Sequence, residues 1–576
     1  MTISQFLISN SKFNCSQSDK ISAALDKFRL SRYDCLAVVD QEQKFCGIIH
    51  RNDFINYFDG EFDDQSTIAD LGLINQEADI ITCSANQPLW LRDLTKFAKA
   101  HRHTYIPAVD QDRMFLGFSY QPNGMALKEL EKNFSPNICV VGMGYVGLTL
   151  AVALAEAGFI VKGLEIDPKK AASLRKGIAT FYERDLQESF RELIKDNRIQ
   201  IAESDDLKET NFAIITVGTP LNSLTGMPNI DYLDHAVDTI KEKLSPGGVL
   251  VLRSTVPVGT GTRLRMQLFN EFESHDVGKA RHIVFAPERT LEGDALNELR
   301  INPQIIGSQS VIANCIAKSV FSKIAPEVIA VEGFEEAELV KLADNTSRDL
   351  HFAFANTLAL ASLEYGIDSI SVIKSANKNY KRTNIALPSP GVGGPCLSKD
   401  PYLMTFGLSN LVSEAKDFLH GGRHISNSIM SEVAKKVAAL KNRLLVDEMF
   451  FFGVAFKGSP ATSDTRESTS IGILELLSPH FKTVNIWDPV VTDYSDLKHI
   501  TNANFLDSWK MQGDICDRQL IVLANNSQKF RQIPWHDVIE GKTKVLVVDL
   551  WGVLDGHLEN FDDQHTVEYF RLGANL

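Results

Sequence analysis

A glycine-rich turn between residues 142 and 147 restricts the fold of this 576-residue chain more than any other segment. The apolar run 138–141 precedes the turn, and a helical apolar pattern covers 148–157. Glycines at 142, 144 and 147 permit a tight turn, close backbone approach to a pyrophosphate, and close packing of helix on strand. Glu165 ends the next apolar run, where a carboxylate accepts ribose hydroxyls and repels a 2′-phosphate. The pattern predicts a site for NAD rather than NADP, while the neighbouring Asp167 is expected to cap a helix.

Strand-like and helical patterns alternate beyond this turn. A first alternation reaches about residue 330, a long helical stretch covers 335–365 with more helix around 410–443, and a second alternation begins at Met449. Such alternation is typical of parallel sheets covered by helices. The expected fold class is α/β, with two Rossmann-like parallel-sheet domains joined by a long central helical region. The apolar runs behind this prediction are 212–215, 249–252, 282–285, 451–456, 484–487, 520–523 and 545–548, and the apolar residues in register on the long helix are Leu339, Leu342, Leu350, Phe354 and Leu358.

The first 125 residues contain an internal repeat with an offset of 70: Val39-Asp40-Gln41 recurs as Val109-Asp110-Gln111, and 45–47 as 115–117. Each copy predicts a helix, a strand, an Asp-centred turn and a strand, and two such units usually pack together. This α+β pair resembles tandem cystathionine-β-synthase (CBS) domains, which often bind adenine nucleotides and regulate an attached enzyme. Asp53 fits the acidic position of the ribose-binding pattern of that family. However, His50 stands where the pattern has a hydroxyl residue, and Asn123 stands where the second copy should have its acid. Nucleotide binding and a purely structural or oligomerising role both stay open.

Composition limits the partners of the chain. There are 59 Lys and Arg against 73 Asp and Glu, a net charge of −14, which argues against general nucleic-acid binding. No apolar run of membrane-spanning length and no signal-peptide pattern are visible, so we expect a cytoplasmic protein without a membrane partner. The 8 cysteines are dispersed without a CxxC pair, so we expect reduced thiols, no disulfide framework and no metal site.

The segment Pro390-Gly-Val-Gly-Gly-Pro-Cys-Leu-Ser-Lys-Asp-Pro401, together with Gly142-Met-Gly-Tyr-Val-Gly-Leu148, resembles the UDP-glucose/GDP-mannose dehydrogenase family. The likeness covers roughly residues 136–555. It implies oxidation of the primary alcohol of a nucleotide sugar to a carboxylate in two NAD-dependent steps. Further matching motifs are Val217-Gly-Thr-Pro220, Ser254-Thr-Val-Pro257, Pro287-Glu-Arg289, Lys341 with Asn345, Phe456-Lys457, and Asp464-Thr-Arg-Glu-Ser468.

Within that family, Pro287-Glu-Arg289 and the segment 299–307 resemble the branch that acts on UDP-N-acetylhexosamines. Pro395 stands where His is common in that branch, and Lys399 is closer to the UDP-glucose type. The expected substrate is therefore a UDP-N-acetylhexosamine oxidised for surface polysaccharide, with UDP-glucose or GDP-mannose as alternatives. Two other functions stay open: a dehydrogenase making a single hydride transfer, and a non-catalytic nucleotide-sensing scaffold.

Cys396 is the expected nucleophile. A thiolate adds to an aldehyde, and the thiohemiacetal can lose a second hydride to give a thioester that water hydrolyses. Cys396 lies in a glycine-flanked loop beside Lys399 and Asp400, and a nearby cation raises the thiolate fraction. By resemblance, Asp400 moves protons, Lys341 stabilises oxyanions, Asn345 holds substrate or water, Thr255 positions water, and Glu288 assists hydrolysis.

The resemblance also implies binding residues and domain limits. Arg382 matches an arginine that reaches the site of a neighbouring subunit, so a homodimer or higher homo-oligomer is expected. The expected cofactor contacts are Gly142, Gly144, Tyr145, Val146, Gly147, Glu165, Thr219, Pro220, Thr255 and Lys399, and the expected substrate contacts are Glu292, Lys341, Arg382, Gly393, Lys457 and Arg466. The expected domains are a tandem CBS-like module at 1–128, an NAD domain at 135–330, a helical connector carrying the catalytic loop at 331–445, and a UDP-sugar domain at 446–576.

Overall fold

The computed structural model describes most of the chain after residue 135. It covers 136–576 except 208–209, 223–225, 269–280, 409, 511–517 and 558–566. Before that it covers 7–8, 14–24, 27, 35–50, 66–71, 74, 81–82, 105–109 and 112–120.

The first α/β domain is built on a sheet whose described strands follow the order β10-β9-β8-β11-β12-β13-β14-β15. All neighbours are parallel except β13 and β14. Along β8, Ile138 and Val140 join the core on one face, while Cys139 and Val141 join the core on the other. A sheet buried on both faces explains the nearly continuous apolar runs. The strands are β8 (Ile138–Val141), β9 (Val161–Leu164), β10 (Ile199–Ala202), β11 (Thr210–Ile215), β12 (Leu244–Leu252), β13 (His282–Phe285), β14 (Gln304–Gly307) and β15 (Val328–Val331), and the helices are α5 (Tyr145–Glu156), α6 (Pro168–Arg175), α7 (Leu186–Lys195), α8 (Asp231–Lys241), α9 (Thr260–Gln267), α11 (Ala295–Ile301) and α12 (Val311–Phe321).

The second α/β domain has an all-parallel sheet whose described strands follow the order β18-β17-β16-β19-β20-β21. Both sheets reverse their strand order beside the first strand, at β8 and β11 in one domain and at β16 and β19 in the other. Ligands of open α/β sheets bind at such switch points. The strands are β16 (Glu448–Phe452), β17 (Thr483–Trp487), β18 (Ala503–Phe505), β19 (Arg518–Leu523), β20 (Lys544–Asp549) and β21 (Val567–Arg571), with α17 (Thr469–Leu477) and α18 (Trp535–Ile539).

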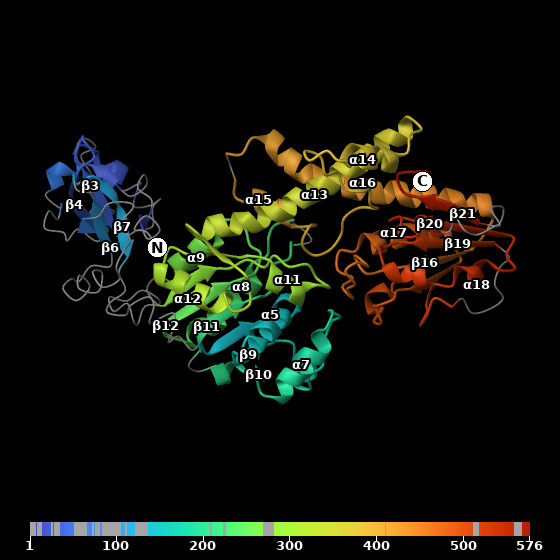
Figure 1. Ribbon diagram of the computed structural model, residues 1–576, viewed down its shortest axis with the longest axis horizontal. Coiled ribbons are helices and arrows are strands. Elements are labelled where there is room, and N and C mark those ends of the chain that lie inside the picture. Colours follow the sequence, from blue (N-terminus) through green and yellow to red (C-terminus); the bar gives the residue numbers. More distant parts are fainter. Residues whose placement is uncertain are drawn as a thin grey trace.

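Two long helices, α13 (Phe334–Glu364) and α16 (Ser413–Leu444), pack on each other and span the distance between the two sheets (Figure 1). The shorter α14 (Ser369–Asn377) and α15 (Asp400–Thr405) accompany them. The apolar register along α13 faces solvent in part, because Leu342 is buried but Leu339 and Phe354 are exposed. The buried side of α13 is instead partly polar, with Lys341, Asn345, Asp349 and Asn356 on it.

The N-terminal repeat is visible as two small sheets in the described segments, β2-β3-β4 and β1-β7-β6-β5. The antiparallel pairs β3–β4 and β6–β7 shift register at equivalent positions, and Gln43 and Arg113 share φ of 64°. The copies meet about an approximate two-fold axis, where Lys44 pairs with Met114 and the rings of Phe45 and Phe115 stack. Asp53 and Asn123 lie outside the described residues. The strands are β1 (Leu7–Ile8), β2 (Asn14–Ser16), β3 (Cys35–Val39), β4 (Phe45–His50), β5 (Ile81–Thr82), β6 (Tyr105–Val109) and β7 (Phe115–Tyr120).

The predicted α/β architecture with its central helices is thus confirmed, with two local corrections. Helix α5 begins at Tyr145 rather than Leu148, directly after the glycine turn. Strand β16 ends at Phe452 rather than Phe456, because Gly453 adopts φ of +95° and turns the chain. No described helix is long and apolar enough to cross a membrane, and no group of His, Cys, Asp and Glu among the described residues has the arrangement of a metal site. Cys15, Cys35 and Cys139 are buried and form no disulfide with another described cysteine, whereas Cys83 and Cys516 lie outside the described residues.

Candidate active site

The glycine turn leaves an open cradle at the N-terminus of α5. Gly142 has φ of +93°, and its N–H donates to the Leu164 carbonyl at 2.8 Å. A Cβ on Gly147 would overlap the Gly142 carbonyl oxygen, so only glycine lets α5 approach β8 this closely. A Cβ on Gly144 would meet no atom within 4 Å, so this glycine leaves free space at the helix end. The turn therefore has room for a pyrophosphate against free backbone N–H groups.

The other predicted cofactor residues lie around this turn. Glu165, directly after β9, accepts the Met143 N–H at 3.1 Å and the Asp167 N–H at 3.0 Å. Asp167 caps α6, as expected. The Thr219 hydroxyl donates to the Thr255 carbonyl, which joins the loops after β11 and β12, and Pro220 is exposed beside them. Val146 is half-buried in the first turn of α5.

The loop 388–399, which carries Cys396, is fixed by tight glycine contacts. Gly391 has φ of +101°, and a Cβ there would lie 2.8 Å from the Ser426 carbonyl of α16. A Cβ on Gly393 would overlap the Glu467 carbonyl, to which the Gly394 N–H donates at 2.9 Å. The loop is therefore held between α16 and the segment 467–469, and Gly393 belongs to this contact.

Cys396 is an exposed, unpaired thiol that ends this loop. Its carbonyl accepts the N–H groups of Lys399 at 3.1 Å and Asp400 at 3.0 Å, forming the turn into α15. Although the residue is exposed, the protein packed around its sulfur removes water from it, and this desolvation raises the pKa of the thiol above its ordinary value. Lys341 and Lys399 lower this pKa, and Asp400 and Glu292 raise it. The two lysines act as expected, but burial outweighs them.

Asp400 joins the predicted catalytic residues into one network. Its side chain is fully buried; Oδ2 accepts from Asn345 Nδ2 at 2.5 Å and Oδ1 pairs with Lys399 Nζ at 2.9 Å. Lys341, one turn before Asn345 on α13, is buried and is the larger of the two cationic influences on Cys396. Among the described residues its ammonium makes no ion pair with a carboxylate. The structure therefore brings together Cys396, Lys399, Asp400, Lys341 and Asn345.

Three of the six predicted substrate residues form a second cluster where the two α/β domains meet. Lys457 donates to the Glu292 carbonyl, and Arg466 binds both oxygens of Asp464 and lies 3.7 Å from Glu292 Oε1. Burial lowers the pKa of Lys457 to about 8. Burial, followed by the Asp464 charge, raises the pKa of Glu292 well above its ordinary value.

Tyr145 connects this cluster to the glycine turn. The Arg466 guanidinium lies 5.6 Å from the centre of its ring, and the Tyr145 hydroxyl lies 3.4 Å from the Ser463 hydroxyl. The predicted cofactor loop of one domain and the predicted substrate loop of the other are therefore in contact.

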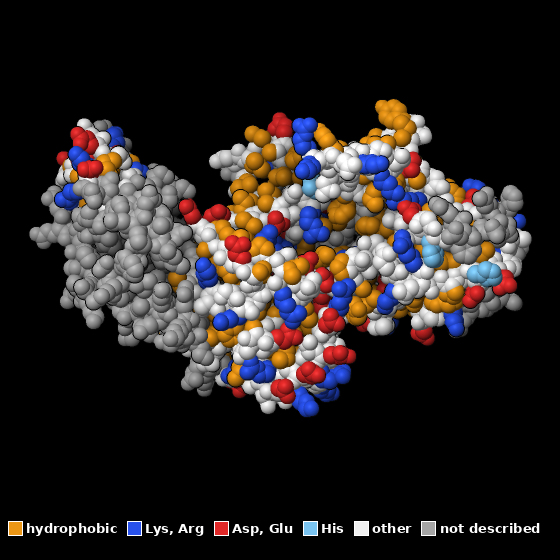
Figure 2. Space-filling model, viewed as in Figure 1, with side chains coloured by type: hydrophobic (Ala, Val, Ile, Leu, Met, Phe, Trp, Pro, Cys, Tyr) orange, Lys and Arg blue, Asp and Glu red, His pale blue; other side chains and the backbone are white. Residues whose placement is uncertain are grey.

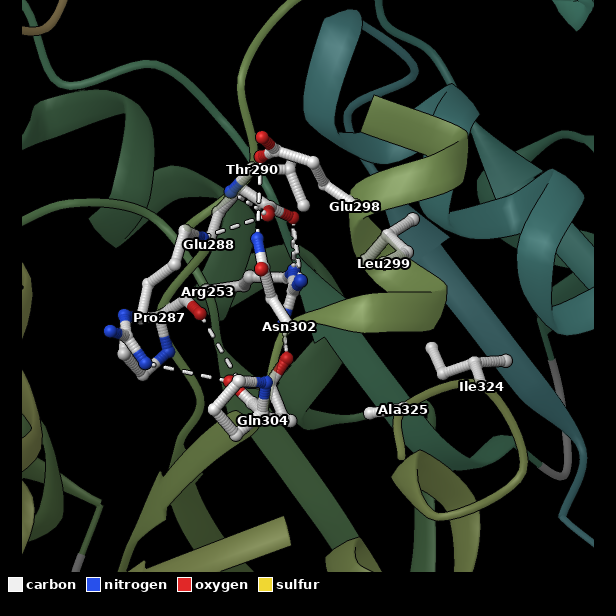
Figure 3. Close-up of a pocket in the computed structure, with 12 residues that line it drawn as sticks. Arg253, Pro287, Glu288, Thr290, Glu298, Leu299, Asn302, Gln304, Ile324 and Ala325 are labelled. Atoms are coloured by element: carbon white, nitrogen blue, oxygen red, sulfur yellow. Dashed lines mark hydrogen bonds and ion pairs between the residues drawn. The ribbon is translucent and has the colours of Figure 1, made fainter. Parts of the chain in front are cut away.

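Glu288 occupies a different environment from the one expected of a hydrolytic base. Its Oε2 pairs with Arg253 Nη2 at 2.5 Å, and its Oε1 accepts the N–H groups of Arg289 and Thr290, each at 2.8 Å. Arg253 also donates to Gln304 Oε1 at 2.9 Å, so the guanidinium lies between two side chains at the edge of a small cavity (Figure 3). Burial would raise the pKa of Glu288, but Arg253 and these hydrogen bonds hold it below its ordinary value. Both oxygens are engaged, so these contacts fix the segment 287–290, and the catalytic role of Glu288 stays a prediction.

Arg382 is not brought to the site of its own chain. It is exposed, and its guanidinium lies 5.1 Å from the ring of Tyr380.

Two structural acids were missed from the sequence. Glu183 accepts the N–H groups of Gly293 at 2.6 Å and Ala295 at 2.8 Å, and so fixes the segment next to Glu292. Asp464 stood in a quoted motif without a role and is the main partner of Arg466. Only Asp464 could have been found from the sequence, because it belongs to the motif 464–468. Nothing in the sequence pointed to Glu183, because its partners are more than 100 residues away along the chain.

Gly144 and Gly147 separate cofactor binding from folding. Gly144→Ala should leave the thermal unfolding midpoint unchanged and weaken NAD binding by about tenfold or more, since a methyl group there fills only the cradle. Gly147→Ala should lower the unfolding midpoint, because its methyl group overlaps backbone. Calorimetry of unfolding and of NAD titration measures both effects; equal NAD affinity in Gly144→Ala and the wild type would contradict this role for the turn.

Comparisons with known proteins agree with this geometry. Residues 136–325 match the NAD binding domain of the UDP-glucose/GDP-mannose dehydrogenase family, 335–418 its central domain, and 450–556 its UDP binding domain. Residues 8–60 match the CBS domain.

Several relatives are similar over most of their length. UDP-N-acetyl-D-mannosamine dehydrogenase of Pyrococcus horikoshii is 28% identical over 72% of this chain and 94% of its own. The enzyme of that name from Methanococcus maripaludis strain C7 is 32% identical over 61% and 79%. The solved structure of the Pyrococcus horikoshii UDP-D-ManNAc dehydrogenase has a TM-score of 0.63 at 26% identity, covering 76% of this chain and 99% of that one. The chain therefore belongs to the UDP-glucose/GDP-mannose dehydrogenase family of NAD-dependent nucleotide-sugar dehydrogenases.

Proposed function

We propose that the chain oxidises the 6-hydroxymethyl group of a UDP-N-acetylhexosamine to a carboxylate through a covalent cysteine intermediate. The observation that carries this proposal is the accessible Cys396 thiol at the end of a rigid loop, surrounded by Lys341, Lys399 and the Asn345–Asp400 pair. A dehydrogenase that makes a single hydride transfer has no need of a nucleophile at this place.

Each residue of this group has a part in the reaction. NAD, when bound, accepts a hydride in each of two oxidations. Lys341 stabilises the alkoxide in the first, and Asp400 takes up or relays its proton. The Cys396 thiolate then forms a bond to C6 of the aldehyde, giving a thiohemiacetal whose oxidation leaves a thioester. Water breaks the carbon–sulfur bond, which frees the thiolate and the carboxylate. The balance is one alcohol, two NAD⁺ and one water to one carboxylate, two NADH and three protons.

The choice of sugar rests on the relatives and on one contact. Relatives named UDP-N-acetyl-D-mannosamine dehydrogenase are 28% to 32% identical to this chain. Arg289, the last residue of Pro287-Glu-Arg289, donates to Asp344 on α13 at 2.8 Å, next to Asn345. This arginine fixes the segment 287–293 against α13, whereas the Pro-Glu-Phe motif usual in the UDP-glucose branch of the family has no charged side chain to make this contact. We infer that the carboxylate product enters surface polysaccharide, and that the reaction takes place in the reducing cytoplasm, where the thiol stays free.

A panel of UDP- and GDP-sugars tests activity and substrate together. The two-step reaction yields two NADH per sugar, and Cys396→Ser should reduce formation of the acid by about 10³-fold or more, since the thioester route is lost. Cys315→Ser, at a half-buried cysteine on α12, is the matched control and should keep full activity.

One NADH per sugar with unimpaired Cys396→Ser would instead indicate single-step oxidation. No NADH from any sugar of the panel would indicate a non-catalytic scaffold.

Lys457 predicts a pH dependence of UDP binding. With a pKa of about 8 it carries its charge at pH 7 and loses it as the pH rises through 8. UDP affinity measured by calorimetry should fall by up to about tenfold per pH unit above that value. Lys457→Arg keeps its charge and should flatten this dependence; the same slope in both proteins would show that Lys457 does not bind the diphosphate.

We propose that a second copy of the chain completes the site through Arg382. The side chains of Phe406, Val412 and Phe418 are 38%, 63% and 66% exposed, and apolar side chains gather over α15 and the start of α16 (Figure 2). Exposed apolar surface of this kind marks an interface. This same helical layer carries Arg382 in the segment between α14 and α15.

Mixing two inactive variants tests for a shared site. Arg382→Ala and Cys396→Ser should each be inactive alone. Subunit exchange in an equimolar mixture should restore up to about a quarter of wild-type activity, because about half of the dimers are mixed and each has one complete site. Failure to restore activity, with exchange shown by mass spectrometry, would place Arg382 outside the partner's site.

We further propose that the N-terminal pair regulates the dehydrogenase or holds its assembly together, with AMP, ADP and ATP as candidate ligands. The support is the CBS match at 8–60 and the two-fold contact between the copies at Lys44 and Met114.

A further inference from the structure

A row of polar side chains on the buried side of α13 faces the loop that ends at Cys396. Asn345, Asp349 and Asn356 are 5%, 0% and 0% exposed, although most neighbouring helices bury apolar residues. Their spacing of four and seven residues puts them on one helix face. Buried polar groups cost free energy unless they are hydrogen-bonded, so this row needs partners.

The row contacts the loop region at three successive places. Asn356 Oδ1 accepts the Ser389 N–H at 2.8 Å at the start of the loop. Asp349 pairs with Arg423 of α16, whose Nε donates to Asp349 Oδ2 at 2.9 Å. The Nη1 of the same arginine donates at 2.8 Å to the carbonyl of Val392, in the middle of the loop. Asn345 donates to Asp400, which directly follows the end of the loop.

We propose that Asp349 and Arg423 are positioning residues, and that this buried ion pair fixes the Val392 backbone and thereby the place of Cys396 relative to Lys341 and Asp400. The proposal rests on the proposed function, because only a nucleophilic Cys396 needs this placement. The contacts on which it is argued are independent of any substrate.

The surroundings of the pair are built to hold it. Arg423 is 5% exposed and also donates to the Ser426 hydroxyl at 3.1 Å. A Cβ on Gly422 would lie 2.5 Å from Asp349 Oδ2, so a glycine lets α16 approach the carboxylate. Burial lowers the pKa of the Arg423 guanidinium only to about 10, so it stays charged at neutral pH.

The pair is better explained by positioning than by stability. Replacing both partners of a buried ion pair by apolar residues is often neutral or stabilising, whereas removing one partner leaves an unpaired buried charge. A fixed guanidinium that holds a loop carbonyl supplies orientation, which an apolar pair cannot. Asn356 Nδ2 and Ser389 Oγ find no hydrogen-bond partner among the described residues; since the Ser389 N–H already donates to Asn356 Oδ1, the two groups are suited to an internal water.

The double variant Asp349→Leu with Arg423→Met tests the proposal. It should keep the unfolding midpoint of the wild type and lower kcat by about 10²-fold, with a smaller change in KM, because a misplacement near 1 Å costs that much.

A second readout needs no substrate. Iodoacetamide labelling of Cys396, followed by peptide mass spectrometry across pH, should show a lower pH midpoint and about threefold or faster labelling at pH 8, since a released loop loses the burial that raises the thiol pKa.

Two further variants complete the design. Asp234→Leu with Arg263→Met removes a partly buried pair of 2.6 Å in the NAD domain, away from the loop, and should change neither kcat nor the labelling profile. Arg423→Lys keeps a cation beside Asp349 but cannot hold both Asp349 and Val392, and it decides the question if the double variant does not fold.

Wild-type labelling and kcat in a folded double variant, or in Arg423→Lys, would overturn the proposal. Absence of NADH formation by the wild type on every sugar would refute the proposed function alone, because the labelling comparison still decides whether the pair positions Cys396.

Discussion

The hydrogen bond between Asn345 of α13 and Asp400 of α15 is the contact on which the rest of the proposed catalytic arrangement depends. It joins the long helix to the turn that carries Cys396, and Lys399 neutralises the second oxygen of the same carboxylate. With Asp400 held on both sides, the thiol is fixed relative to Lys341, one turn earlier on α13. The residues of the proposed catalytic group are therefore held by contacts between α13 and the turn into α15.

This unit lies between two sheets that both present a switch point. The glycine turn follows β8, and Lys457 follows β16, at equivalent places in the two strand orders. The domains meet through Tyr145, Arg466 and the Lys457–Glu292 contact, so the proposed cofactor and substrate loops touch each other. The helices α13 and α16 set the distance between the sheets.

An acidic chain can bind two anionic ligands in this arrangement because groups next to each binding site interact with the negative charge of the ligand. The glycine turn offers backbone N–H groups, and burial concentrates the effect of single cations such as Lys341 and Lys457. Burial has the opposite effect on Cys396: it raises the pKa of the thiol, and this outweighs the lowering by the neighbouring lysines. In the proposed mechanism, thiolate formation therefore depends on the nearby cations and on substrate binding together.

The sequence by itself determined the strand–turn–helix unit, the two α/β domains, the central helices and the segments that contain Cys396, Lys341 and Lys457. Those features are local, since glycine geometry and apolar periodicity express themselves within a few residues. Only the tertiary structure decided which polar groups are paired. Asp349 and Arg423 are 74 residues apart and Arg253 and Glu288 35 apart, and no pattern within one element reveals a partner on another. For the same reason the ion pair of Glu288 with Arg253 emerged only from the structure, and the catalytic role of Glu288 stays a prediction. The structure also leaves the exposed Arg382 outside the site of its own chain.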